Sequence, residues 1–254
     1  MHPDYIAEFR FYGALNDFLP PAQRQRTLIY RFNGHPGIKD PIEAFGVPHT
    51  EVDLIIANGQ SVAFEYQLQA GDRVAVFPAF TRLDVGALCR LREPIPSEPR
   101  FVLDVNLGKL AKRLRLLGFD SLYRNDYRDA EVADIAAGQQ RIALTRDRRL
   151  LFARKITYGY WVRAVDVAAQ VEEVLLRFDL YQAIRPFKRC SVCNGLVAPV
   201  AKADVLHRLE PKTRMYYELF YRCADCQRIY WEGSHIEDMR QRFAGFSVPG
   251  IDID

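Results

Sequence analysis

Residues 101–120 read FVLDVNLGKLAKRLRLLGFD, and this stretch decides the fold class. Its first five residues form an apolar run typical of a buried strand, with a single acid, Asp104, inside it. Apolar side chains then recur at helical spacing up to Gly118, a residue type that commonly ends a helix. Residues 119–123 follow as a second short strand. The stretch therefore predicts a strand, a helix and another strand in close succession.

The same alternation continues along the chain after residue 128. The pattern predicts a helix over 129–137, a third strand over 141–145, a fourth strand over 160–164, and a helix over 167–178 that Asp166 caps. Strands that alternate with helices are typical of a parallel sheet covered by helices on both faces. We therefore expect an α/β core over residues 100–186.

Four acids lie where the predicted strands end. Asp104 is near the end of the first strand, Asp147 follows the third, and Asp129 and Glu131 begin the helix after the second. The carboxyl edge of an open parallel sheet is where sites form, and clustered carboxylates bind hard cations such as Mg²⁺ or Mn²⁺. Local roles remain open, because Asp129 can cap its helix and Asp147 can cap a turn. Asn106 can shape the Asp104 loop or touch a substrate.

Two Cys-x-x-Cys pairs form the clearest metal motif of the chain. Cys190 and Cys193 make one pair, Cys223 and Cys226 the other, and 29 residues separate the two pairs. Two such knuckles bring four thiolates to one tetrahedral ion, which predicts a structural zinc with no open coordination position. Two disulfides are the alternative, and the absence of a secretory signal disfavours them.

The region before the α/β core predicts a separate small fold. Strands at 7–12 and 27–32, a short helix at 37–46 and strands near 54–59 and 71–78 give a grasp-like order. Pro94, Pro96 and Pro99 lie close together and predict a stiff connector. The expected division is a grasp-like domain at 1–86, a connector at 87–99, the α/β core at 100–186, a cysteine module at 187–243 and a loose tail at 244–254.

Charge is unevenly distributed along the chain. The formal net charge is only +3 and the sequence pI about 8.6. Between residues 141 and 189, however, there are eleven Lys and Arg residues and only five acids. Such a basic field favours a polyanionic partner, and a solvated charged face is the alternative. No apolar run is long enough for a membrane span, and the N-terminus Met1-His2-Pro3-Asp4 lacks the basic and apolar regions of a signal peptide, so we expect a cytoplasmic protein.

Five motifs together resemble the PIN-like Mut-seven C-terminal RNase family. They are FVLDVNLGKLAKRLRLLGFD (101–120), DAEVADIA (129–136), IALTRDRRL (142–150), CSVCNGL (190–196) and RCADCQRIYWEGSH (222–235). The resemblance implies a PIN-type nuclease core with an appended zinc ribbon, which hydrolyses RNA with a divalent cation. By motif match, the acids of the family fall on Asp104, Asp129 and Asp147, and Glu131 is a further candidate.

The grasp-like region resembles the ubiquitin-like sulfur carriers of the MoaD/ThiS group. The motifs VDLIIANG (52–59) and GDRVAVFP (71–78) carry this likeness. Those carriers end in a free Gly-Gly, whereas this chain continues through Ala79-Phe80-Thr81-Arg82. A docking or stabilising role, with a protein partner for this domain, is therefore expected in place of sulfur carriage.

The resulting hypothesis is an α/β PIN-like parallel-sheet core between an N-terminal β-grasp (ubiquitin-like) domain and a C-terminal zinc ribbon. It is expected to act as a metal-dependent endoribonuclease on RNA, with tRNA and rRNA as candidate substrates. The residues expected to contact RNA are Lys109, Lys112, Arg113, Arg146, Arg148 and Asn106. Tyr230, Trp231 and His235 can stack on bases or hold the ribbon against the core. The rival hypotheses are an RNA-binding adaptor without turnover and a protein-interaction module centred on the ubiquitin-like domain.

Overall fold

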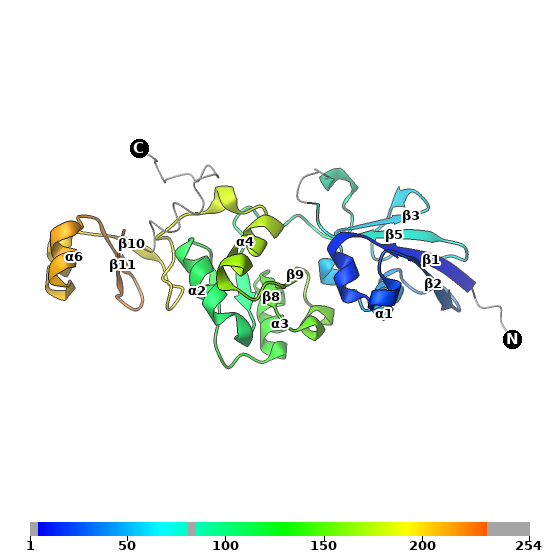
Figure 1. Cartoon of the computed structure of the whole chain (residues 1–254), viewed down its shortest axis with the longest axis horizontal. Helices are drawn as coiled ribbons and strands as arrows, with labels where there is room; N and C mark the ends of the chain where they lie inside the picture. The colour runs from blue at the N-terminus through cyan, green and yellow to red at the C-terminus, as the bar shows by residue number, and fades with distance from the viewer. Residues whose placement is uncertain (1–4, 81–84, 233–254) are drawn as a thin grey trace. The chain divides into compact units, whose positions relative to one another are not determined.

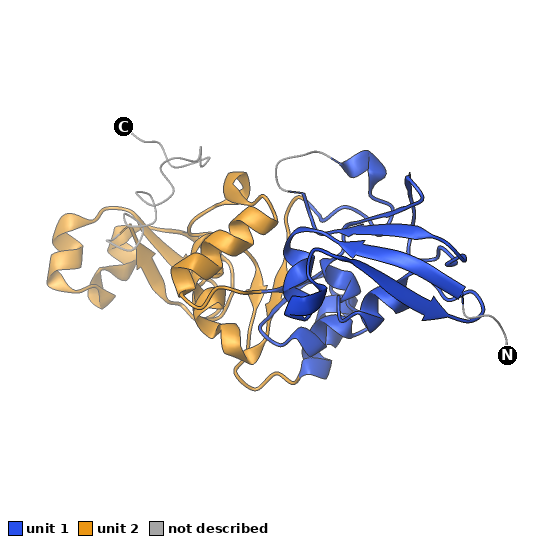
Figure 2. Cartoon of the chain, turned by 45° about the vertical axis from the view of Figure 1, so that its right-hand side comes forward, with its two compact units in different colours: residues 1–96, 129–161 blue, residues 97–128, 162–254 orange. Residues whose placement is uncertain are grey.

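The computed structural model describes residues 5–80 and 85–232. The chain divides into two compact units, shown in Figure 2. The first unit combines Met1–Pro96 with Asp129–Trp161, and the second combines Ser97–Arg128 with Val162–Asp254. His235 and the predicted tail at 244–254 lie outside the described residues.

A five-stranded sheet forms the N-terminal part of the first unit (Figure 1). Its strands are β1 (Tyr5–Phe11), β2 (Thr27–Phe32), β3 (Leu54–Ala57), β4 (Gln60–Ser61) and β5 (Arg73–Phe77), in the order β2-β1-β5-β3-β4. β1 runs parallel to β5, and the other neighbours are antiparallel. The short helix α1 (Lys39–Ala44) follows β2, and 3-10 turns lie at Gly13–Phe18, Pro21–Gln23, His49–Glu51 and Gly86–Leu88. This arrangement confirms the predicted β-grasp fold.

The grasp core follows from alternation along the two central strands. Phe9 and Phe11 of β1 face inward together with Val74 and Val76 of β5, while the residues between them are more exposed. Ile42 of α1 is fully buried against the same cluster. Large aromatic side chains on one face therefore fix the register, because a slip by one residue would turn them to solvent.

The first unit also contains part of the predicted α/β core. Its elements there are α3 (Asp129–Gly138), β8 (Ile142–Thr145), the 3-10 helix η6 (Arg148–Phe152) and β9 (Gly159–Trp161). β8 and β9 run parallel, with Leu144 opposite Tyr160. All four residues of β8 are buried, as expected for a strand covered on both faces.

The second unit begins with the strand–helix–strand stretch on which the fold prediction rested. β6 (Phe101–Leu103) is fully buried and pairs parallel with β7 (Ser121–Leu122). The 3-10 turn η5 (Val105–Leu107) leads into α2 (Gly108–Leu116), which packs beside α4 (Val167–Arg177), followed by a 3-10 turn at Tyr181–Ala183. The predicted parallel arrangement is confirmed by these strands and by the pair β8 and β9.

The cysteine module forms a three-stranded antiparallel sheet in the second unit. Its strands are β10 (Val197–Val200), β11 (Phe220–Cys223) and β12 (Ile229–Trp231). Between β10 and β11 the chain forms α5 (Lys202–Val205), a 3-10 turn (Leu206–Arg208) and α6 (Pro211–Tyr216). A small cluster of Val205, Leu209 and Phe220 holds this insertion on the sheet, and Trp231 packs against it. Trp231 therefore packs inside the cysteine module.

Gly118 ends α2 as the sequence predicts. Its φ is +97°, its N–H donates to the Arg115 carbonyl, and the N–H of Phe119 donates to the Leu114 carbonyl. This pair of bonds is a Schellman motif, which satisfies carbonyl groups that the helix end leaves unpaired. Gly138 behaves differently: it is the last residue of α3, and Gln140 takes the left-handed conformation instead.

Replacing Gly118 by alanine is expected to lower the free energy of unfolding by about 3 kcal/mol. A Cβ there would lie 2.0 Å from the backbone oxygen of Arg185, on a residue whose φ already disfavours side chains. Gly138→Ala is the matched control, since its Cβ would meet nothing within 4 Å. Denaturant titration of both variants measures the difference. Equal, small effects would contradict the close approach of the two backbone segments at Gly118.

Candidate functional site

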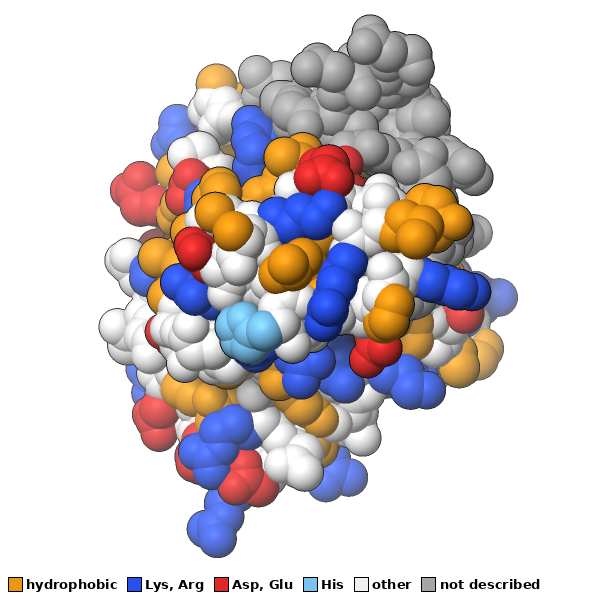
Figure 3. Space-filling view, turned by 90° about the vertical axis from the view of Figure 1, so that its left-hand side faces the viewer, with side chains coloured by type: hydrophobic (Ala, Val, Ile, Leu, Met, Phe, Trp, Pro, Cys, Tyr) orange, Lys and Arg blue, Asp and Glu red, His pale blue; other side chains and the backbone are white. Residues whose placement is uncertain are grey.

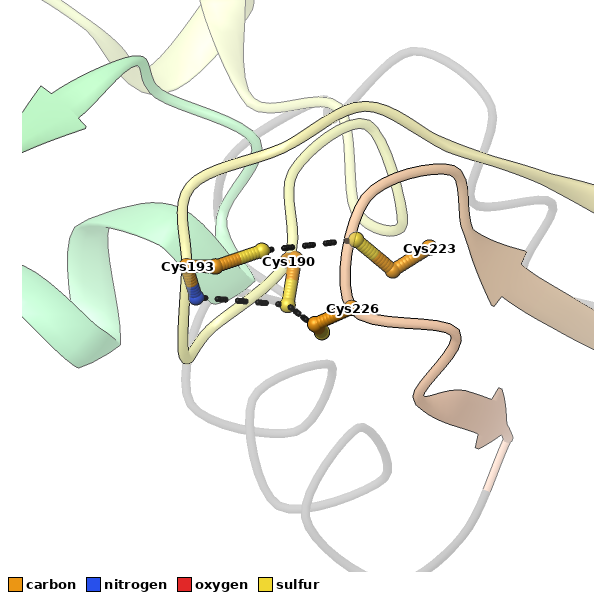
Figure 4. A group of neighbouring side chains, drawn as sticks. All are labelled: Cys190, Cys193, Cys223 and Cys226. Carbon is orange, nitrogen blue, oxygen red and sulfur yellow. Dashed lines mark hydrogen bonds between the residues drawn. The ribbon is translucent and has the colours of Figure 1, made fainter.

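The four cysteines of the two knuckles converge in the second unit (Figure 4). Cys190 and Cys193 come from the loop before β10, Cys223 ends β11, and Cys226 lies in the turn before β12. The Sγ atoms of Cys190 and Cys226 are 3.5 Å apart, and those of Cys193 and Cys223 are 3.4 Å apart. All four Sγ atoms lie within 4.8 Å of one another, and all four cysteines are free thiols. Neither close Sγ pair lies at the roughly 2.05 Å of a disulfide bond, so the structure favours the predicted four-thiol cluster over two disulfides.

These distances fit a tetrahedral zinc ion. With Zn–S bonds of about 2.3 Å, tetrahedral geometry separates neighbouring sulfurs by roughly 3.8 Å. Four thiols complete the coordination sphere of Zn²⁺, so the cluster can hold a structural ion and leaves no position for a substrate. Gly195 allows the two knuckles to approach, because a Cβ there would lie 2.2 Å from the Asp225 carboxylate.

Tyr230 supports one of the four thiols directly. Its hydroxyl lies 3.0 Å from Cys190 Sγ and accepts the N–H of Ser191 at 3.1 Å. Burial raises the pKa of the Cys190 thiol, but the Cys193 N–H and the Tyr230 hydroxyl outweigh it and lower this pKa to about 6. Burial and the bond to Cys190 raise the pKa of Tyr230 to about 12. Cys190 is thus predisposed to bind metal as a thiolate.

Arg115 attaches the first knuckle to the α/β part of the unit. It is only 4% exposed, and its guanidinium donates to the carbonyls of Ser121 at 2.8 Å and Val192 at 2.8 Å. Burial lowers the pKa of Arg115, and the nearby Cys190 and Cys193 thiols act against that shift. By helical spacing, Lys109, Lys112, Arg113 and Arg115 all fall on the side of the helix opposite its leucines, which predicts an exposed Arg115; the structure buries it. Its one-turn spacing from the buried Ala111 was the signal for an inward position.

Asn194 makes a second attachment of the same knuckle. Its side-chain oxygen accepts the N–H of Ser121 at 2.9 Å, and its amide donates to Asp120 at 2.8 Å. Arg189 forms an ion pair with the same Asp120 at 3.2 Å. The cysteine module therefore packs on β7 through the hydrogen bonds of Asn194, while the buried Nε of Arg189 has no hydrogen-bond partner among the described residues. Sequence analysis did not identify these contacts.

Asp104 is a buried acid at the end of β6, as the sequence predicts. It is 3% exposed, and its Oδ1 accepts the N–H of Asn106 at 2.8 Å, which caps the turn η5. Asn106 itself is exposed. A buried carboxylate is costly unless it is hydrogen-bonded or ligated, and the Asn106 N–H supplies one such bond.

The other three predicted acids lie in the first unit. Asp129 is the first residue of α3 and Glu131 is in its first turn, and both are exposed. Asp147 follows β8: its N–H donates to the Thr145 hydroxyl at 2.8 Å, and its Oδ1 accepts the N–H of Arg149 at 2.8 Å. Asp147 therefore caps η6, which is the local role that the sequence had left open. This capping role is compatible with a role in catalysis. Asp104 belongs to the second unit.

The predicted RNA-contacting cations occupy different surroundings. Lys109, Lys112 and Arg113 share one exposed face of α2, because their spacing is three and four residues. Arg146 is exposed after β8. Arg148 places its guanidinium carbon 3.8 Å from the centre of the Trp161 ring and 5.4 Å from that of Phe18. The Arg148 guanidinium therefore already makes cation–π contacts within the protein.

A family model described as the Mut7-C RNAse domain matches residues 99–243, more than half of the chain. The chain belongs to the Mut7-C RNAse family. A second model, described as Mut7-C ubiquitin, matches residues 4–84, ahead of the Mut7-C RNAse domain. The two models confirm the predicted combination of a ubiquitin-like domain with this type of RNase domain.

Two solved structures are also similar to part of this chain. One is the H. volcanii small archaeal modifier protein 1, and the other is SAMP1 from Haloferax volcanii. Each is 19% identical to this chain and covers 30% of it, while 99% and 96% of their own chains are covered, with TM-scores of 0.25 and 0.24. No curated protein matches the chain. None of the described helices is long and apolar enough to cross a membrane.

Tyr230→Phe is expected to make zinc leave the Mut7-C RNAse domain at higher pH than in the wild type. The variant loses the hydroxyl that helps to lower the pKa of Cys190, so protons compete better with metal as the pH falls. Release of zinc to a coloured chelator between pH 8 and pH 4 measures the midpoint. Tyr216→Phe, on the exposed part of α6, is the control and should leave the midpoint unchanged. Identical midpoints in all three proteins would show that Tyr230 does not stabilise the thiolate.

Proposed function

We propose that this chain is a metal-dependent endoribonuclease of the PIN type, which hydrolyses RNA phosphodiesters. The observation that carries the proposal is Asp104, a buried acid at the carboxyl end of a parallel strand inside the matched RNase domain. Sites of parallel α/β sheets form at this edge of the strands. Asp129 and Asp147, with Glu131 as a further candidate, are the other acids of the proposed site.

The donor chemistry of these acids suits a hard divalent cation. Asp104, Asp129 and Asp147 would hold Mg²⁺ or Mn²⁺, both of which prefer carboxylate oxygens. When bound, the cation supplies charge neutralisation at the phosphate and an activated water. The chain's own contribution is the placement of these acids: Asp104 is fixed by the Asn106 N–H, and Asp147 by Thr145 and Arg149.

Exposed cations of the RNase domain would position the substrate. Lys109, Lys112 and Arg113 form one face of α2, and Arg146 follows β8 one residue before Asp147. Arg148 and Asn106 are proposed as further contacts. RNA, including tRNA and rRNA, is a suitable partner for these cations because its backbone carries one negative charge per nucleotide. We place this activity in the cytoplasm, where a zinc ion rather than disulfides would hold the four thiols.

Incubation of the full-length protein with a labelled mixed RNA pool tests the proposal. Cleavage is expected with Mn²⁺ or Mg²⁺ and not with a chelator that leaves the zinc in place. Lys112→Ala should weaken RNA binding several-fold and reduce the slope of its salt dependence by about one. RNA binding without cleavage in either metal would reject the nuclease and favour the adaptor.

The surface of the cysteine module supports that RNA-binding adaptor as the second candidate. The face in Figure 3 shows Lys and Arg side chains interspersed with hydrophobic ones. On α6 and the loop after it, Met215, Tyr216 and Leu219 are 72%, 71% and 63% exposed, with Lys212 and Arg214 beside them in sequence. Exposed aromatic and basic side chains together suit single-stranded RNA, because bases stack on the rings.

The ubiquitin-like domain supports a third candidate, a protein-interaction module. Ile6 and Ile29 are 43% and 50% exposed on its outer sheet face, and Tyr12 stacks on Phe77 at 4.4 Å. A protein partner would cover these side chains. RNA affinity that survives deletion of residues 1–86 would favour the adaptor over this candidate.

A further inference from the structure

Three buried polar residues of the ubiquitin-like region need partners from elsewhere in the chain. His49, Thr50 and Glu51 form one 3-10 turn and are 6%, 1% and 2% exposed. Buried polar side chains are costly unless hydrogen-bonded, and a free-standing domain would turn such a segment to solvent. The side chains of this turn therefore require hydrogen-bond partners from another segment of the chain.

Residues 151–161 supply a partner for each of the three side chains. His49 Nε2 bonds the Ile156 carbonyl at 3.0 Å, Thr50 Oγ1 donates to the Leu151 carbonyl at 3.3 Å, and Glu51 Oε1 accepts the Trp161 N–H at 2.6 Å. The other ring nitrogen of His49 lies 2.6 Å from Glu43. All these residues belong to the first unit (Figure 2). Three polar contacts in a row fix this segment in one position against the turn.

Arg92 adds a second bridge between the same two parts of the first unit. Its guanidinium donates to the carbonyls of Thr50 at 3.2 Å and of Thr157 at 2.7 Å, and also to the Val52 carbonyl. It forms an ion pair with Asp53 at 2.7 Å. A planar guanidinium can bind several carbonyls at once, which a lysine cannot do in the same geometry.

Close packing leaves little room for the segment to move. A Cβ on Gly159 would lie 2.8 Å from the Leu151 side chain and 3.2 Å from Cβ of Thr50. Arg148, the residue directly after Asp147, stacks on Trp161 of β9 and on Phe18 of the ubiquitin-like region. The contacts therefore reach along the chain to the neighbour of a proposed catalytic acid.

We propose that the turn at His49–Glu51 and Arg92 are positioning elements for residues 147–161 and, through them, for Asp147. The ubiquitin-like region then forms a structural part of the unit that carries this acid and does not act as a tethered module. The catalytic half of this proposal rests on the nuclease function proposed above. The structural half concerns only the conformation of residues 148–161.

Arg92→Met and Thr50→Val in the full-length protein test the proposal. Thr50→Val keeps the shape and removes one hydroxyl, so it gives a second answer if Arg92→Met folds poorly. Arg31→Met, on an exposed residue of β2, is the matched control. The first measurement is amide hydrogen exchange of residues 148–161, which needs no enzymatic activity. We expect roughly tenfold faster exchange there in both variants and no change in the control.

The second measurement is single-turnover RNA cleavage as a function of Mn²⁺ concentration. A misplaced Asp147 should raise the half-saturating Mn²⁺ concentration several-fold while RNA affinity stays as in the wild type. Unchanged exchange in both variants would overturn the proposal. Faster exchange with an unchanged Mn²⁺ requirement would overturn its catalytic half. Wild-type protein that never cleaves RNA would refute the proposed function and the catalytic half, and the exchange result would still decide the structural half.

Discussion

Replacing Asp104 by asparagine lowers the rate of RNA hydrolysis by about a hundredfold or more, if this acid helps to hold the catalytic cation. Asparagine keeps an oxygen that can accept the Asn106 N–H, so the turn η5 should remain folded. The negative charge is lost, and with it most of the affinity for a hard cation. Asp147→Asn should lower the rate by a similar factor, because it removes the same charge. The turn η6 should stay folded, since the asparagine oxygen can still accept the Arg149 N–H.

Single-turnover cleavage of a labelled RNA in Mn²⁺, beside a binding titration, measures both effects. RNA binding should stay the same or tighten, because a negative charge facing phosphate has been removed. Asp166→Asn is the matched control: Asp166 also accepts backbone N–H groups, from Ala168 and Ala169 at the start of α4, and asparagine caps a helix equally well. Cleavage that persists unchanged in Asp104→Asn would make this acid structural.

Replacing Cys190 by serine is expected to abolish zinc binding and to unfold the cysteine module. Wild-type protein should carry about one zinc per chain, and the variant close to none. Metal affinity in such sites contributes directly to folding, so the loss should be on the order of 5 kcal/mol in the free energy of unfolding of this module. Because Arg115 and Asn194 bind the same knuckle, the disturbance should extend to β7.

Elemental analysis and thermal unfolding of freshly prepared, reduced protein test the zinc prediction. Cys89→Ser is the control, since Cys89 is not one of the four clustered cysteines. Wild-type protein without zinc would refute the prediction. A Cys190→Ser variant that retains zinc and stability would show that three thiols suffice.

Much of the fold follows from local sequence patterns. The periodicity of residues 107–117 gives α2, and Gly118 marks its end because the left-handed φ favours glycine. The two Cys-x-x-Cys knuckles predict a four-thiol cluster, since the ligand spacing is itself a local property. Asp104 follows from one acid in an apolar strand. For α2 and Asp104 the deciding pattern lies within a few residues or repeats at a fixed period. For the cysteines, the spacing within each pair is local, and folding brings the two pairs together across 29 residues.

The tertiary structure alone decided which distant groups satisfy the buried polar side chains. His49 bonds Ile156 and Thr50 bonds Leu151, each across more than 100 residues of chain. In the sequence, Arg115 is one of several cations on the same helix. Only the tertiary structure shows that it is buried and donates to the Val192 carbonyl. A local pattern can show that a side chain is polar. Its partner depends on which backbone groups folding buries beside it, and no spacing along the sequence encodes that choice.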